Sequence, residues 1–204
     1  MYSFIGRKAP LHVTTKALLA DGTIVDNFNL QEAIKGKKAV FFFYPLDFTF
    51  VCPTELLALN AQYAEFQERN TEVFAISVDS VFSHLAWQNT AINEGGIGKV
   101  GYTMLSDINH SLCRTFGVEH PEENIALRAT FILDEEGTIW SQTVHNLPIG
   151  RSIDEIIRVV DAISHHQQHG EVCPANWNKG KQSFHATKSG VSEYLQNTTA
   201  DTIS

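Results

Sequence analysis

The hydrophobic positions of this chain form two apolar runs with a helix-like stretch between them. Residues 39–44 are apolar throughout, as expected of a strand that is covered on both faces. A second apolar run covers residues 73–78. Between the runs, apolar side chains recur at helical spacing, at Leu56, Leu59, Tyr63 and Phe66. The pattern predicts a strand–helix–strand unit, and open α/β sheets carry their sites at the carboxyl ends of such strands.

The rest of the first 164 residues adds two hairpins and further helices. Residues 13–28 predict a hairpin around the turn signal Asp21-Gly22, and residues 126–144 predict a second one around a polar turn. The other expected elements are helices at 81–92, at 109–116 and from Ile153 onward, and a short strand at 102–105. Together they predict an α/β domain over residues 1–164 with an N-terminal hairpin.

The hydrophobic periodicity fades from His165 onward. Residues 179–204 are polar apart from isolated Phe184, Tyr194 and Leu195. We therefore expect residues 165–204 to form a C-terminal arm that packs on another surface rather than forming a core of its own. Aromatic side chains of this arm, such as Trp177 and Phe184, should then be poorly buried in a single chain.

Composition excludes several classes of partner. With 204 residues, of which 43% are hydrophobic and 19% charged, the chain suits one soluble globular domain. The net charge of -8 argues against nucleic acid and anionic membranes, which select basic patches. No apolar run approaches the ~18 residues of a membrane span. Arg7 and Lys8 stand where a signal peptide needs its apolar segment, so we expect a cytoplasmic protein.

The three cysteines, Cys52, Cys113 and Cys173, are too few and too scattered for a disulfide-stapled scaffold, and no C-x-x-C pair occurs. His165-His166-x-x-His169 precedes Cys173, but the spacing matches no standard zinc site, and we expect a solvated helix end there. No Gly-rich phosphate loop is visible. We therefore expect neither a metal nor a cofactor, and the open options are inert core cysteines or thiol redox chemistry.

The stretch of residues 41–55 passes from a strand into a helix start. Pro53 suits the first position of a helix, which places Cys52 at the helix N-terminus. Unpaired N–H groups and the helix dipole favour an anion there, and a thiol so placed loses its proton more readily. A buried cysteine that packs as a small hydrophobe is the alternative. Position alone leaves both interpretations open.

Two motifs resemble those of a known family. Pro45-x-x-x-Thr49-x-x-Cys52 resembles the active-site motif of the peroxiredoxins, and residues 171–177, Glu-Val-Cys-Pro-Ala-Asn-Trp, resemble the resolving-cysteine segment of typical 2-Cys members. The resemblance extends from residue 4 to the C-terminus. It implies a thioredoxin-like fold with a central mixed sheet flanked by helices. It also implies a thiol peroxidase that reduces hydrogen peroxide and alkyl hydroperoxides.

The resemblance also implies roles for residues of the motif. Cys52 would attack the peroxide and become a sulfenic acid, Thr49 would hydrogen-bond the substrate, and Pro45 would shield the loop from water. Arg128 would lie beside the thiol and hold the peroxide in line. As a charge in an apolar strand, Arg128 would also fit an outward-facing position. Glu55 is expected to support Arg128 or the helix N-terminus.

Cys173 would be the resolving cysteine by the same resemblance. Its thiol would condense with the sulfenic acid of another subunit in an antiparallel homodimer, which yields a disulfide and water. Both segments would have to unfold locally, because a disulfide needs Cα atoms within ~7 Å. Thioredoxin or a dedicated flavoprotein reductase would return the thiols. We further expect a ring of five dimers, with Trp87 either in the core or near the interface between dimers.

The remaining features concern a third cysteine, regulation and alternative functions. Cys113 matches no family motif and is assigned to helix packing. Gly95-Gly96-Ile97-Gly98 and Tyr194-Leu195 are imperfect matches to the segments of peroxide-sensitive members, which predicts intermediate sensitivity to over-oxidation. A holdase chaperone on the same ring and a redox relay that passes oxidation from Cys52 to another protein are alternative functions.

Overall fold

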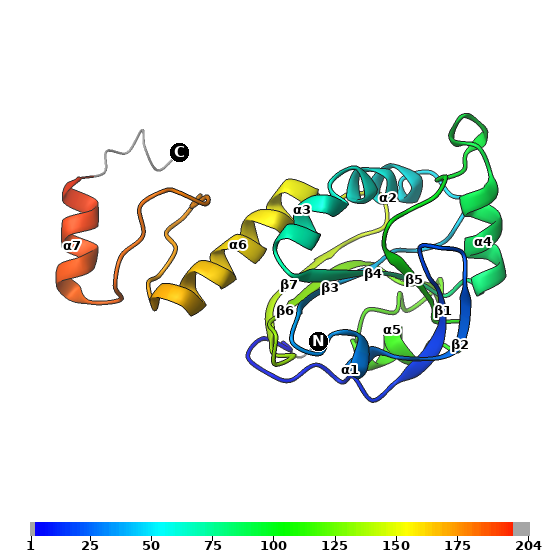
Figure 1. Ribbon diagram of the computed structural model, residues 1–204, viewed down its shortest axis with the longest axis horizontal. Helices are drawn as coiled ribbons and strands as arrows, with labels where there is room; N and C mark the ends of the chain where they lie inside the picture. Colours follow the sequence, from blue (N-terminus) through cyan, green and yellow to red (C-terminus); the bar gives the residue numbers. More distant parts are fainter. Residues whose placement is uncertain (1–2, 198–204) are drawn as a thin grey trace. The chain divides into compact units, whose positions relative to one another are not determined.

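A computed structural model describes residues 3–197 of the chain (Figure 1). The chain divides into two compact units, of which the first ends at Ile153 and the second begins at Asp154. The hydrophobic pattern predicts a boundary after residue 164. The two divisions differ by the helix α6 (Ile153–His169), which passes through the dividing point.

The first unit is built on a seven-stranded mixed sheet with the order β2-β1-β5-β4-β3-β6-β7. The middle strands β3, β4 and β5 are parallel, and the other pairs are antiparallel. The strands are β1 (Thr14–Leu18), β2 (Ile24–Asn29), β3 (Lys38–Phe43), β4 (Thr71–Ser77), β5 (Thr103–Ser106), β6 (Arg128–Leu133) and β7 (Ile139–His145). All residues of β3 are buried, as the apolar run predicts. The two hairpins and the mixed α/β architecture expected from the sequence are thus confirmed.

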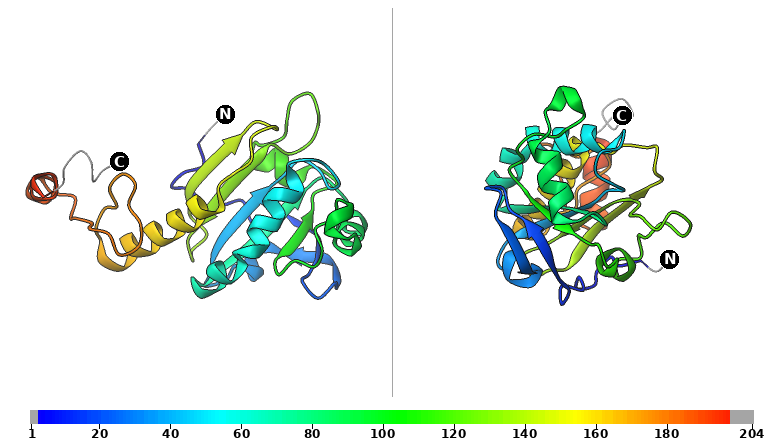
Figure 2. Two further views of the ribbon diagram at one scale, coloured as in Figure 1. Left: turned by 90° about the horizontal axis from the view of Figure 1, so that it is seen from above. Right: turned by 90° about the vertical axis from the view of Figure 1, so that its right-hand side faces the viewer.

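Helices cover both faces of this sheet. They are α1 (Leu30–Ala33), α2 (Cys52–Ala61), α3 (Tyr63–Glu68), α4 (Val81–Asn89) and α5 (Ser111–Thr115), with a 3-10 turn η1 (Ile92–Glu94). In Figure 1, α2 and α3 lie on one side of the sheet and α5 on the other. Phe41 and Phe43 of β3 pack with Phe116, which directly follows α5. The helix α4 packs on β1 and β5 (Figure 2). None of the helices in residues 3–197 is long and apolar enough to cross a membrane.

The predicted strand–helix–strand unit is present as β3, α2 and β4, with β3 and β4 parallel. The helix expected after Pro53 is interrupted at Gln62, which ends α2 and precedes α3. The short helix α1 was not predicted, because its four residues span too little of the chain to show a helical period. Its start is capped by the side chain of Asn29, which accepts from the N–H of Glu32.

The second unit comprises the rest of α6, an irregular segment and α7 (Lys188–Gln196), which was not predicted because none of its residues is buried. Val172 and Phe184 pair through two backbone hydrogen bonds of 2.8 and 3.4 Å. The expectation of poor burial is wrong for Trp177, which is 2% exposed. Its backbone oxygen accepts from Arg158 Nη1, and its indole N–H donates to the backbone oxygen of Lys181. The centre of its ring lies 4.9 Å from that of the His165 ring. Packing within the unit therefore buries it.

Candidate active site

Cys52 lies at the end of the segment that connects the strand β3 to the helix α2. Residues 44–51 connect the two elements, and Cys52 is the first residue of α2, with Pro53 next to it in the first turn. In the first turn of α2, the Thr54 hydroxyl donates to the backbone oxygen of Val51 at 2.7 Å. The Cys52 side chain is fully buried. The thiol therefore sits at the N-terminus of α2 and away from bulk water.

Arg128 meets this thiol from another strand. It is the first residue of β6, and Phe43 of β3 pairs with Ala129, so Arg128 lies level with the end of β3. Its Nη1 donates to Cys52 Sγ at 3.4 Å and its Nε donates to the oxygen of Leu147 at 2.6 Å. The side chain is buried, so the outward-facing alternative is wrong. The guanidinium is therefore fixed in direct contact with the Cys52 sulfur.

Glu55 holds the guanidinium in place. It stands one turn after Cys52, and its Oε2 accepts from Arg128 Nη1 at 2.8 Å. The same carboxylate accepts from Arg151 through Nε at 2.8 Å and Nη2 at 3.0 Å. Burial alone would raise the pKa of Glu55, but the hydrogen bonds and charge of Arg151 and the charge of Arg128 outweigh it, so the pKa lies below its ordinary value. Glu55 therefore stays ionised between two guanidinium groups.

Arg151 is a member of the site that the sequence analysis missed. Its side chain is buried, its guanidinium lies 3.3 Å from the centre of the Phe42 ring, and its Nη1 donates to the oxygen of Ala129 at 2.8 Å. With Arg128 and Arg151 positive and Glu55 negative, one net positive charge remains beside the sulfur. One signal was present in the sequence: Arg151 lies two residues before α6, and cations are disfavoured at helix N-termini.

The other predicted residues lie at different places. Pro45 is buried and Thr49 is half-buried, both in the segment that leads to Cys52. The Thr49 hydroxyl donates to the oxygen of Leu46 at 2.8 Å. Cys173 belongs to the second unit, where it is half-buried with its Sγ 3.6 Å from the oxygen of Ala162. The structure thus brings Cys52, Arg128 and Glu55 together. The contact of Cys173 with Ala162 lies within the second unit.

The histidines at the end of α6 are more than a solvated helix end. His165 Nε2 lies 3.2 Å from Glu171 Oε2 and 2.8 Å from Ser183 Oγ, and His166 Nδ1 lies 2.7 Å from the oxygen of Glu171. His165 and His166 are half-buried under the chain that follows Gly170, while His169 at the end of the helix is exposed. Within residues 3–197, no group of three or more His, Cys, Asp or Glu residues has the arrangement of a metal site.

Cys113 is fully buried in α5. The carboxylate of Asp107 accepts the N–H groups of Leu112 and Cys113 at 2.8 and 2.7 Å. Burial and the negative charge of Asp107 raise the pKa of the Cys113 thiol far above its ordinary value. The thiol therefore stays protonated, which agrees with a packing role.

In the native protein, Cys113 is expected to resist alkylation by iodoacetamide at about pH 8, because only the thiolate reacts. The half-buried Cys173 should be modified roughly tenfold faster or more. Mass spectrometry of peptides from timed samples measures both rates. Labelling of Cys113 in guanidinium chloride shows that the reagent reaches it once unfolded, and native labelling at the rate of Cys173 would contradict the assignment.

Comparisons with known proteins agree with this site. Residues 5–142 match the AhpC/TSA family, and residues 162–197 match the C-terminal domain of 1-Cys peroxiredoxin. Alkyl hydroperoxide reductase C of Buchnera aphidicola subsp. Schizaphis graminum is 46% identical over 194 residues, which are 95% of this chain and 98% of that protein. The chloroplastic 2-Cys peroxiredoxin BAS1 of Hordeum vulgare is 45% identical over 94% of this chain and 90% of that protein.

A solved structure extends the likeness to three dimensions. The reduced 2-Cys peroxiredoxin of Plasmodium vivax superimposes with a TM-score of 0.91 at 43% sequence identity, over 96% of this chain and 100% of that one. This agreement confirms the thioredoxin-like fold that the two sequence motifs implied.

Proposed function

This chain belongs to the AhpC/TSA family and is a peroxide-reducing peroxiredoxin, and from this premise we propose that Cys52 is its peroxidatic cysteine and Cys173 its resolving cysteine. One observation carries the first assignment. The buried Cys52 sulfur lies 3.4 Å from the guanidinium of Arg128, in a site with one net positive charge. A buried thiolate completes that charge balance.

In the first step, the Cys52 thiolate attacks the nearer peroxide oxygen and the O–O bond breaks. The sulfur is oxidised to a sulfenic acid, and the departing oxygen takes a proton and leaves as water or an alcohol. Arg128 stabilises the negative charge that moves onto the departing oxygen. Thr49 already donates its hydroxyl proton to Leu46, so its oxygen is available to accept the peroxide O–H. Pro45 closes the pocket against water.

In the second step, the Cys173 thiol of a partner subunit attacks the Cys52 sulfenic acid. An S–S bond forms, and the sulfenic oxygen leaves as water. A dithiol protein, thioredoxin or a dedicated flavoprotein reductase, then returns both thiols. In this scheme residues 165–204 are the arm that carries Cys173. Sensitivity to over-oxidation at an intermediate level stays a prediction.

The assembly that this scheme needs is an antiparallel homodimer, and a ring of five dimers is proposed beyond it. The strand β7 lies at the edge of the sheet and exposes part of Trp140, so it can accept a second copy. Phe48, Phe50 and Phe82 are exposed near the active-site segment and the start of α4. Large apolar side chains of this kind support a contact between dimers. A cytoplasmic location is proposed from the likeness to bacterial relatives.

One equivalent of hydrogen peroxide should convert the reduced protein into a covalent dimer on a non-reducing gel. The dimer should be absent in Cys52→Ser and in Cys173→Ser, because each removes one sulfur of the bond, and it should persist in the control Cys113→Ser. A crosslink within one chain, or a dimer that survives Cys173→Ser, would overturn the assignment of the resolving cysteine.

A further inference from the structure

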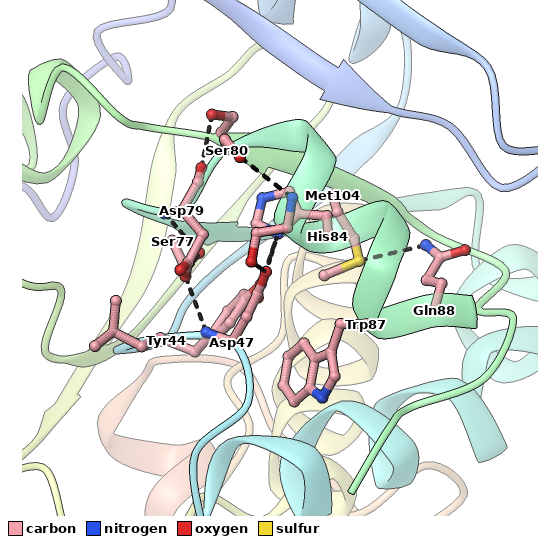
Figure 3. Close-up of polar contacts among 12 residues, drawn as sticks. Tyr44, Asp47, Ser77, Asp79, Ser80, His84, Trp87, Gln88 and Met104 are labelled. Atoms are coloured by element: carbon pink, nitrogen blue, oxygen red, sulfur yellow. Dashed lines mark hydrogen bonds and ion pairs between the residues drawn. The ribbon is translucent and has the colours of Figure 1, made fainter. Parts of the chain in front are cut away.

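A buried polar cluster lies beside the active-site segment, and the mechanism above does not use it. Its centre is Asp47, whose Oδ1 accepts from the Tyr44 hydroxyl at 2.7 Å. Its Oδ2 accepts from Ser83 Oγ at 2.8 Å and lies 2.8 Å from His84 Nδ1. Figure 3 shows Tyr44 and Asp47, from the segment between β3 and α2, converging with His84 of α4. Asp47, Tyr44 and His84 are buried, so these bonds are shielded from water.

The cluster ties the segment of residues 44–51 to the strands β3 and β4 and to the helix α4. Tyr44 directly follows β3, while Ser83 and His84 stand on α4. The N–H of Asp47 donates to Asp79 Oδ2 at 2.9 Å, and Asp79 follows β4 (Figure 3). Burial and the charge of Asp47 raise the pKa of Tyr44, so the phenol keeps the proton that it donates to Asp47. Both carboxylate oxygens and the backbone N–H of Asp47 are thereby bonded to neighbouring elements, which holds its backbone in place.

The chain between Asp47 and Cys52 has much weaker support. None of residues 48–51 is buried, and Phe50 is 92% exposed. Phe48 has a φ of 54°, a left-handed conformation that costs a residue other than glycine about 1 kcal/mol or more. The Thr49 hydroxyl donates to the oxygen of Leu46, and the ring of Phe48 lies 5.7 Å from that of the buried Trp87. Asp47 is the last residue before the reactive cysteine whose side chain is held by fully buried hydrogen bonds.

We propose that Asp47 is a positioning residue, which fixes the segment from which Thr49 and Cys52 meet the peroxide and keeps it folded until the sulfenic acid has formed. The inference rests on the proposed role of Cys52. This hold on the segment has opposite effects on sulfenic acid formation and on disulfide formation. A firmly held segment speeds attack on the peroxide by keeping the reacting groups in line. It slows disulfide formation, because Cys52 must leave its pocket to reach Cys173.

The substitution Asp47→Asn tests the proposal, since it keeps the shape but removes the charge and one of the two acceptor oxygens. Quenched-flow alkylation and mass spectrometry of the full-length protein measure sulfenic acid formation and disulfide formation separately. We expect the first rate constant to fall about tenfold. The second should rise, and less Cys52 sulfinic acid should accumulate at a given peroxide concentration. Asp26→Asn is the matched control, because Asp26 is exposed and forms a surface ion pair with Lys16.

A second pair of variants separates positioning from folding. His84→Asn can keep a donor near the Nδ1 position and should retain most of the first rate, whereas His84→Leu cannot and should resemble Asp47→Asn. The proposal would be overturned if both rate constants of Asp47→Asn lay within twofold of those of Asp26→Asn. It would also be overturned if sulfenic acid formation and disulfide formation slowed in parallel. Peroxide consumption that survives Cys52→Ser would instead overturn the proposed function, so the two failures are distinguishable.

Discussion

Replacing Arg128 by methionine should slow the reaction of Cys52 with hydrogen peroxide by about 100- to 1,000-fold, the usual effect of removing one hydrogen-bond donor from a preorganised site. The donor is buried and lies 3.4 Å from the sulfur, so water cannot substitute for it. Glu55 keeps its bonds to Arg151 in this variant, which limits the loss of stability. The fold should therefore survive while the first chemical step fails.

Competition kinetics or stopped-flow measurement of Cys52 oxidation checks this result. Arg114→Met is the matched control, since Arg114 is an exposed arginine that pairs with Glu119 and should leave the rate unchanged. Arg128→Lys should be intermediate, because one ammonium group cannot reproduce the fork that bonds Glu55, Leu147 and Cys52 together. A rate within threefold of the wild type in Arg128→Met would rule out the guanidinium as the group that stabilises the reacting atoms.

Replacing Glu55 by glutamine should destabilise the protein by about 3–5 kcal/mol, the typical cost of breaking a buried ion pair by removing one partner. Arg128 and Arg151 would face each other without the carboxylate that now separates them. Urea unfolding at one fixed protein concentration measures the change, because association shifts the apparent stability. Glu65→Gln is the control: the exposed Glu65 pairs with Arg69, four residues on at the end of α3, and such pairs contribute about 0.5 kcal/mol or less.

The stability contributed by Glu55 should depend on pH in a defined direction. Its pKa in the folded protein lies below the ordinary value of 4.5, so folding favours the ionised form. The contribution is therefore complete above about pH 4.5 and is lost as the pH falls through the lower folded-state value. The difference in unfolding free energy between the wild type and Glu55→Gln should shrink below that pH. A difference that stays constant from neutral pH into this acid range would contradict the ionised pair.

The two substitutions act on one group of charges but should be separable in practice. Arg128→Met should reduce the rate far more than the stability, because Glu55 remains satisfied by Arg151. Glu55→Gln should reduce the stability strongly, and it should affect the rate only through the position of Arg128. Equal loss of both quantities in both variants would mean that the site collapses as a whole.

Local patterns in the sequence accounted for much of the fold. The apolar run before Pro45, the helical spacing after Pro53 and the turn residues of the hairpins each depend on neighbours within a few residues, and the structure has all three. The N-terminal helix position of Cys52 is of the same kind. Features without local periodicity were missed, such as α1 and α7, and the burial of Trp177 was mispredicted because its contacts come from a chain reversal after α6.

By itself, the sequence determined where the reactive cysteine stands, since the strand end, the proline and the helix start lie within fifteen residues of each other, from 41 to 55. The charge balance around the sulfur was decided only by the tertiary structure. Arg128 and Arg151 lie 73 and 96 positions after Glu55, and the pairing of β3 with β6 brings Arg128 to the thiol. The hydrogen bonds that hold Asp47 likewise come from distant residues, Ser83 and His84 of α4. Ion pairs and buried hydrogen bonds join groups by distance in space, and no spacing along the chain encodes which distant side chain will supply them.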